Sequence, residues 1–100
     1  MDTELLTTDD PALAEVGQLN QEMEALAVEG EWEKISALLD RRNRLLRQLG
    51  PEAKREAFEA SRRSTERIRR LAEVAQREVA DKLSRLQRGR EATDSYQAHA

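Results

Sequence analysis

The chain has 100 residues, of which 37% are charged and only 3% aromatic, and its formal net charge is −3. This length predicts one domain, residues 1–100, with a small core and no large catalytic cleft, since a domain of this size buries only somewhat above ~60% of its unfolded surface. The absence of cysteine excludes disulfides, thiolate nucleophiles and cysteine metal sites. The acidic N-terminus is not a secretory signal and no apolar run is long enough to span a membrane, so we expect a cytoplasmic protein without membrane contact.

The charges are unevenly divided along the chain. Residues 1–40 hold eleven Asp and Glu against one Lys, whereas residues 41–90 hold sixteen Lys and Arg against seven acids. The simpler interpretation is that an acidic first helix lies beside basic later helices and neutralises them. The alternative is a basic patch for an acidic partner or nucleic acid, made of Arg62, Arg63, Arg67, Arg69 and Arg70. The lack of interleaved aromatic residues disfavours nucleic acid.

The first predicted helix covers about residues 10–29 and follows an N-terminal stretch that we expect to be frayed. Asp9 and Asp10 can cap this helix, and Pro11 has the backbone angle of a first helical position. Apolar residues then recur at steps of four and three, as in a heptad seam. They are Ala12, Val16, Leu19, Met23 and Leu26.

Gly30 separates the first helix from the second, which is predicted for residues 31–49. Glycine can adopt the left-handed conformation that ends a helix. Because the break is so short, the two helices are predicted to form an antiparallel hairpin. Trp32 is expected to close the end of the hairpin's core.

The second predicted helix carries the densest apolar pattern in the chain. Leu38 with Leu45 and Leu39 with Leu46 form two adjacent stripes, so we expect this helix to contact two neighbours, as the middle helix of a bundle does. Arg42 interrupts the leucine pattern. We interpret it as a side chain that covers its apolar neighbours while its charged end reaches solvent, or as a contact kept for a partner.

Gly50 and Pro51 separate the second helix from a third, which is predicted for residues 52–88 and is about 55 Å long. Gly89 is expected to end it, and residues 90–100 are expected to form a flexible tail. The predicted fold class is therefore all-α. It is an antiparallel helical hairpin plus one long third helix, in a three-helix bundle with coiled-coil-like packing.

Helix lengths carry the main functional argument. The first two helices are about 30 Å long, so they cannot cover a third helix of about 55 Å. Residues from about Val74 onward are expected to extend past the hairpin and to expose apolar side chains at positions 75, 79, 83 and 86. A soluble protein rarely leaves such a stripe uncovered unless another chain uses it. The sequence leaves three outcomes open: a second copy, a different partner helix, or a break that folds the helix back.

The residue patterns of enzymes are missing. The single histidine is His99, next to the last residue, so neither a histidine-based triad nor a multi-histidine metal site can form. There is no glycine-rich phosphate loop. The carboxylate pairs lie at predicted helix ends, where capping explains them. We therefore expect no enzymatic activity, no cofactor and no metal.

Three stretches of the chain together resemble the FliT-type family of flagellar export chaperones, with FlgN-type chaperones as the close alternative. They are the first helix ending in LAVEGEW, the leucine-rich ISALLDRRNRLLRQL, and a long charged helix that ends shortly before SYQ. The resemblance implies a cytoplasmic, non-enzymatic protein that binds the C-terminal segment of the filament-cap protein and contacts export-apparatus proteins. Some members inhibit the flagellar master regulator, and some carry a fourth helix that covers the partner-binding surface, which this sequence is not predicted to form.

The hypothesis for the partner site is that an amphipathic helix of the client docks against the second and third helices. The six expected apolar anchors are Leu38, Leu45, Ile68, Leu71, Val79 and Leu86. The expected polar rim, which could attract an acidic client, consists of Arg42, Arg67 and Arg70. Each apolar anchor can equally be a core residue, and only the length argument singles out Val79 and Leu86. The alternative functions are a structural coiled-coil homodimer or adaptor without a secretion client and, after it, a nucleic-acid binder.

Overall fold

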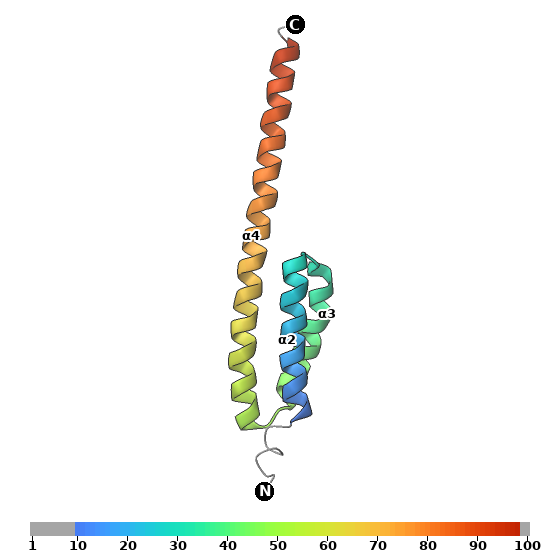
Figure 1. Ribbon diagram of the computed structural model, residues 1–100, viewed down its shortest axis with the longest axis vertical. Coiled ribbons are helices and arrows are strands. Elements are labelled where there is room, and N and C mark those ends of the chain that lie inside the picture. The colour runs from blue at the N-terminus through green and yellow to red at the C-terminus, as the bar shows by residue number, and fades with distance from the viewer. Residues whose placement is uncertain (1–9, 99–100) are drawn as a thin grey trace.

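The structure is a computed structural model that describes residues 10–98, which form the helices α2 (Pro11–Glu29), α3 (Trp32–Gln48) and α4 (Pro51–Ala98). The predictions for Asp9, the N-terminal stretch and His99 lie outside the described residues. α2 and α3 form a hairpin, and α4 runs beside the hairpin and continues far beyond its tip (Figure 1). The molecule measures 85 × 19 × 18 Å. The predicted all-α hairpin with a long third helix is confirmed.

Both α2 and α4 begin at a proline. Proline suits the first helical position because the N–H group that it lacks would have no intrahelical partner there. Before Pro11, the Asp10 carboxylate accepts hydrogen bonds from two N–H groups of the first turn, at 3.0 and 3.4 Å. It thereby satisfies donors that a helix start leaves free. Before Pro51, Leu49 is extended and buried, so the connection from α3 to α4 is anchored in the core.

Gly30 forms the turn between α2 and α3, as predicted. Its φ angle is +76°, in the left-handed region. The N–H groups of Gly30 and Glu31 donate to the carbonyls of Ala27 and Leu26, at 3.1 and 2.8 Å. This pair of bonds is a Schellman motif, which satisfies carbonyls at the end of a helix and favours glycine because it has no Cβ.

The middle helix is α2. It contacts both α3 and α4 extensively, whereas α3 and α4 contact each other far less. The second helix does touch two neighbours, as predicted, but its expected place as the middle helix is wrong. The reason lies in side-chain size: α4 places the small buried residues Ala57, Ser61 and Ser64 in the core, and small side chains at a contact let two helix axes approach closely.

The core consists of two apolar clusters. The lower cluster lies near the connection from α3 to α4 and is centred on Val16, Leu46, Leu49 and Ala57. The upper cluster lies near the hairpin tip and is centred on Met23, Ala27 and Ile35. Trp32 is half-buried and packs against the upper cluster, so its predicted place at the end of the hairpin's core is confirmed.

α4 contains 48 residues and does not end at Gly89. The predicted helix end at residue 88 and the flexible tail are therefore wrong for residues 90–98, which continue the helix. Among the glycines of the described chain, only Gly30 has a positive φ. A glycine in an exposed helix costs only about 1 kcal/mol relative to alanine, which does not by itself break a helix. The Gly89 carbonyl also accepts a hydrogen bond from the Thr93 hydroxyl at 2.9 Å.

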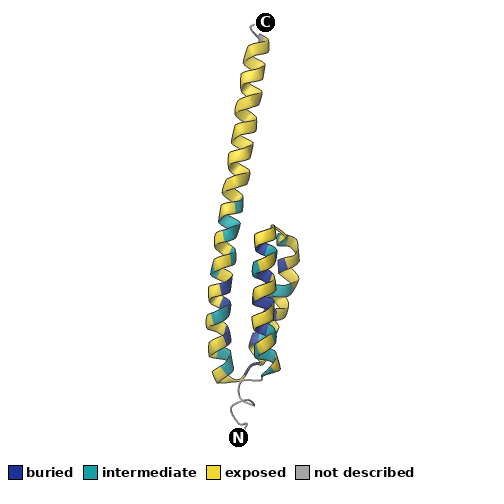
Figure 2. Cartoon of the chain, in the orientation of Figure 1, coloured by how far each residue is buried: buried dark blue, intermediate teal, exposed yellow. Residues whose placement is uncertain are grey.

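The C-terminal half of α4 extends beyond the hairpin. Figure 2 shows buried residues of α4 only beside the hairpin and exposed residues above it. Val79 is 57% exposed and Leu86 is 66% exposed. The predicted extension past the hairpin is present, and we call residues 75–98 the overhang. Within residues 10–98, no helix has the length and apolar content of a membrane span.

Replacing Gly30 by alanine is expected to destabilise the protein by about 1 to 2 kcal/mol, because a Cβ is strained in the left-handed conformation. An added Cβ meets nothing closer than the Trp32 ring nitrogen at 4.0 Å, so the cost is conformational and not a clash. The matched control is Gly17→Ala in α2, where an added Cβ meets nothing within 4 Å. It is expected to stabilise by up to about 1 kcal/mol. Urea unfolding followed by circular dichroism measures both, and stabilisation by Gly30→Ala would contradict the turn assignment.

Candidate functional site

A groove of about 630 Å³ lies between α3 and α4. It exists because both helices pack mainly on α2 and not on each other. Its α3 wall includes Arg42 and Leu46, and its α4 wall includes Phe58 and Thr65. Phe58, the single phenylalanine of the chain, is 52% exposed. Phe58 therefore adds exposed apolar surface to the α4 wall of the groove.

Arg42 lies inside the bundle and lines this groove with only 6% of its surface exposed. The prediction that it reaches solvent as a rim residue is wrong. Its Nη1 donates to Asn20 Oδ1 and to Thr65 Oγ1, each at 3.1 Å, and its Nη2 donates to the Asn43 side chain at 3.3 Å. These neutral acceptors hold the guanidinium in the interior. Burial lowers the pKa of Arg42, because loss of water disfavours the charged form.

The bonds of Arg42 belong to a polar layer that crosses all three helices. Asn20 of α2 donates to Ser61 Oγ of α4 at 3.2 Å and accepts from Arg42 of α3. Thr65 of α4 completes the layer through its hydroxyl. We call Asn20, Arg42, Ser61 and Thr65 the polar layer. In the order of α2 it falls between Val16 of the lower cluster and Met23 of the upper cluster.

Two carboxylates of the groove are already paired within α4. Arg62 donates to Glu59 at 3.2 Å, and this hydrogen bond lowers the pKa of Glu59. Arg69 donates to Glu66 at 2.5 Å and lowers the pKa of Glu66 in the same way. Both carboxylates are therefore charged and neutralised at pH 7, and the remaining charges of the groove lining are positive.

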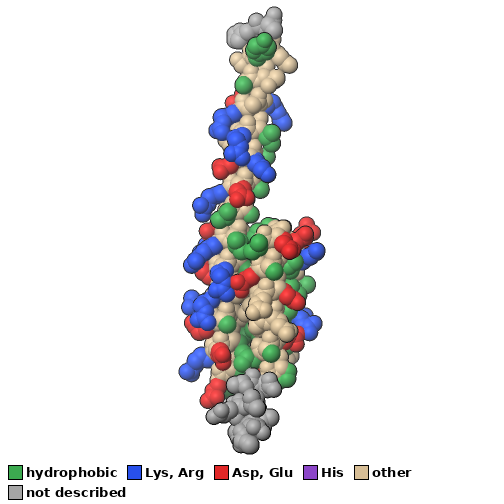
Figure 3. All heavy atoms as spheres, viewed as in Figure 1, with side chains coloured by type: hydrophobic (Ala, Val, Ile, Leu, Met, Phe, Trp, Pro, Cys, Tyr) green, Lys and Arg blue, Asp and Glu red, His purple; other side chains and the backbone are tan. Residues whose placement is uncertain are grey.

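A row of residues at seven-residue spacing runs along α4 from the groove to the overhang. Phe58, Thr65, Ala72, Val79 and Leu86 follow one another at steps of seven residues. Residues seven apart on a helix lie nearly in line, with a drift of about 20° per step, which adds up to about 80° between Phe58 and Leu86. This row, which we call the α4 line, is about 42 Å long. Figure 3 shows hydrophobic side chains exposed among Lys and Arg on the overhang.

A second hollow, of about 350 Å³, lies between α2 and α4 at the hairpin tip. Three predicted site residues, Leu71, Arg67 and Arg70, line it together. Val28 of α2 and Val74 of α4 line the same hollow, and both are exposed. The hollow thus combines an apolar floor with two arginines of the predicted rim.

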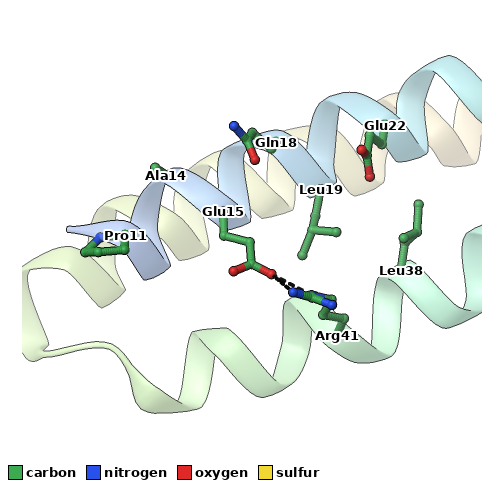
Figure 4. A pocket seen from close by; sticks show the side chains of 8 residues that line it. All are labelled: Pro11, Ala14, Glu15, Gln18, Leu19, Glu22, Leu38 and Arg41. Carbon is green, nitrogen blue, oxygen red and sulfur yellow. Dashed lines mark hydrogen bonds and ion pairs between the residues drawn. The ribbon is translucent and has the colours of Figure 1, made fainter. Parts of the chain in front are cut away.

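The structure does not bring all predicted anchors to one surface. Leu38 lies in a hollow of about 510 Å³ between α2 and α3, where Glu15 and Arg41 form an ion pair (Figure 4). Leu45 packs against the lower cluster and Ile68 against the upper cluster. These three residues are half-buried. The predicted anchors that stand free of the core are Val79 and Leu86.

Sequence reasoning missed Phe58, Thr65 and Val28 as candidate site residues. The seven-residue spacing from Val79 back to Phe58 was the signal that could have found the first two. Thr65 and Ala72 are not large apolar residues, so a search for apolar periodicity alone does not detect this spacing. Val28 lies off the apolar seam of the first helix, so no periodicity in the sequence points to it.

Ion pairs link the acidic first helix to the basic helices. Glu15 of α2 pairs with Arg41 of α3, and Glu24 of α2 pairs with Arg67 of α4, with Nε of Arg67 at 2.7 Å from the Glu24 carboxylate. These contacts support the simpler interpretation of the charge asymmetry. Four arginines of the alternative basic patch are paired with carboxylates: Arg62, Arg67, Arg69 and Arg70.

Comparison with known proteins gave one finding. The model of the family described as flagellar protein FliT matches residues 11–98. The searches of curated proteins and of solved structures gave no match. Across residues 10–98, no cluster of three or more His, Cys, Asp or Glu residues could hold a metal ion.

Glu24→Gln is expected to lower the free energy of unfolding at pH 7 by about 1 kcal/mol, as the partly exposed ion pair with Arg67 is lost. The hydrogen bond from Arg67 lowers the pKa of Glu24 below its ordinary 4.5. The carboxylate therefore stabilises the fold above pH 4.5, and this contribution disappears as the pH falls through the lowered pKa. Urea unfolding at pH 7 and at pH 3 measures the difference. The control is Glu22→Gln, also on α2 and exposed, and an equal loss in both variants would contradict the role of the pair.

Proposed function

The chain belongs to the FliT family of flagellar proteins, which are export chaperones and not enzymes, and from this premise we propose that its client is the C-terminal helical segment of the filament-cap protein. In this proposal the protein binds the segment in the cytoplasm before export and delivers the client to the export apparatus. The observation that supports it most directly is the overhang, whose apolar side chains have no cover within the described chain.

An amphipathic client helix fits the α4 line. Such helices dock through apolar residues at steps of three, four and seven, which is the spacing that Val79 and Leu86 present. The client helix would lie along the overhang and enter the groove between α3 and α4 beside Phe58. Ile68, Leu71, Leu38 and Leu45 then support the surface from the core, while Arg67 and Arg70 border the hollow at the hairpin tip.

Val79→Asp and Leu86→Asp are each expected to weaken binding of the client segment at least tenfold, or about 1.4 kcal/mol, because they place a charge in an apolar contact. Calorimetric titration of the full chain with the C-terminal fragment of the filament-cap protein measures this. Both residues are exposed, so the fold is expected to be retained, which circular dichroism checks.

The matched control is Ser84→Asp, which adds the same charge to a different face of the overhang. It is expected to bind like the unmodified protein. If Val79→Asp and Leu86→Asp also bind like the unmodified protein, the client docks elsewhere. If the unmodified protein does not bind the fragment, the proposed client is wrong.

A structural homodimer is the second candidate, and the charge pattern of α4 favours an antiparallel form of it. Residues 73–81 hold three acids and one Arg, whereas residues 82–90 hold four Lys and Arg and no acid. Antiparallel pairing of two overhangs would place the acidic part of each against the basic part of the other. Such complementary charges fix the register and orientation of paired helices.

Sedimentation equilibrium separates the two candidates. The chaperone proposal expects a monomer of 11.4 kDa over the micromolar range. Twice this mass, reduced to the monomer value by Val79→Asp but not by Ser84→Asp, would favour the homodimer instead.

A further inference from the structure

We infer that Arg42 is a specificity-determining residue, which selects an Asp or Glu on the helix that docks in the groove between α3 and α4. This inference rests on the proposed function in one respect, namely that the occupant is the helix of a partner protein. It adds the chemistry of recognition: an amphipathic helix with one carboxylate directed at the polar layer and an apolar residue placed on Phe58.

The first argument is that Arg42 is a buried cation without an anion. Its three hydrogen-bond acceptors, Asn20, Asn43 and Thr65, are all neutral. Among residues 10–98, no carboxylate forms an ion pair with it. A buried charge is costly unless an opposite charge compensates it. Hydrogen bonds that Arg42 donates to amide and hydroxyl oxygens offset part of this cost, and a bond to a carboxylate would offset more.

The second argument is that the guanidinium has spare donors. It carries five N–H groups, of which the structure pairs three. Nε has no hydrogen-bond partner, and Nη2 uses one of its two N–H groups. Nε is itself buried, so a carboxylate that docks in the groove meets the remaining N–H of Nη2. A hydrogen bond from a charged donor to a carboxylate is stronger than one to a neutral acceptor.

The third argument concerns the charges around the groove. Arg55 and Arg62 also line it, so the groove lining holds three arginines and two glutamates. Both glutamates already form ion pairs, Glu59 with Arg62, and Glu66 with Arg69 and Arg70. An incoming carboxylate thus meets paired acids and a net positive lining. This favours an acidic residue and disfavours a basic one at the same position.

The positions of Thr65 and Phe58 set the spacing of the ligand. Thr65 accepts a hydrogen bond from Arg42, so the guanidinium lies beside Thr65 along the axis of α4. Phe58 lies seven residues earlier, two turns or about 10.5 Å along the helix. A ligand helix parallel or antiparallel to α4 would match both contacts with an acidic and an apolar residue two turns apart.

The test uses two synthetic amphipathic helical peptides of about 20 residues, long enough to span the groove. Both carry leucines at heptad spacing, and they differ only in having Glu or Gln two turns from a leucine. Titrated into the full chain, the Glu peptide is expected to bind at least tenfold more tightly. The preference is expected to vanish for Arg42→Gln, to persist in part for Arg42→Lys, and to persist with weaker binding of both peptides for Phe58→Ala.

The outcomes separate this inference from the proposed client. Equal binding of the Glu and Gln peptides to the unmodified protein overturns the role of Arg42, and this comparison does not depend on whether Arg42 variants fold. A Glu preference that survives in a folded Arg42→Gln variant also overturns it.

The cap-protein fragment is titrated in parallel. If it fails to bind while the Glu preference and its Arg42 dependence hold, the proposed client is wrong and the carboxylate selection stands. A dimer that Phe58→Asp dissociates would place a second copy in the groove and overturn the assignment of a partner helix.

Discussion

The mismatch between helix lengths is the constraint on which the rest of the structure depends. α2 and α3 have 19 and 17 residues, and α4 has 48. At 1.5 Å per residue the hairpin covers about 28 Å of a helix about 72 Å long. No arrangement of two short helices can hide the remainder, so the apolar residues of the overhang stay exposed. The fold therefore buries a small core but leaves apolar side chains of the overhang exposed to a partner.

The polar layer accounts for how so small a core keeps one register. Apolar clusters alone allow neighbouring helices to slide, because leucine packs similarly at successive turns. A buried hydrogen-bonded group pairs well in one register only, at some cost in stability. Asn20, Arg42 and Ser61 each come from a different helix, so their bonds specify the positions of all three helices together. The same layer leaves the Nε donor of Arg42 buried without a hydrogen-bond partner.

The hairpin, the turn at Gly30 and the overhang could be predicted because each follows from local rules. Proline and glycine mark where helices begin and turn, and helix lengths follow from the distance between these residues. The burial of Arg42 could not be predicted, since two of its three acceptors, Asn20 and Thr65, lie 22 and 23 positions away in the sequence. Gly89 does not end α4, because a single glycine in an exposed helix costs only about 1 kcal/mol. The choice of middle helix depended on pairwise packing, which apolar periodicity does not contain.

Side-chain size decides where the open surface lies. Ala57, Ser61 and Ser64 let α2 approach α4 closely, whereas α4 presents Phe58 and Thr65 to the groove that separates it from α3. Packing thus leaves the groove open on the side of α4 that carries the α4 line. The length mismatch leaves Val79 and Leu86 uncovered on the same line. Two independent causes therefore expose residues of the α4 line, which turns by about 80° around the helix over its length of about 42 Å.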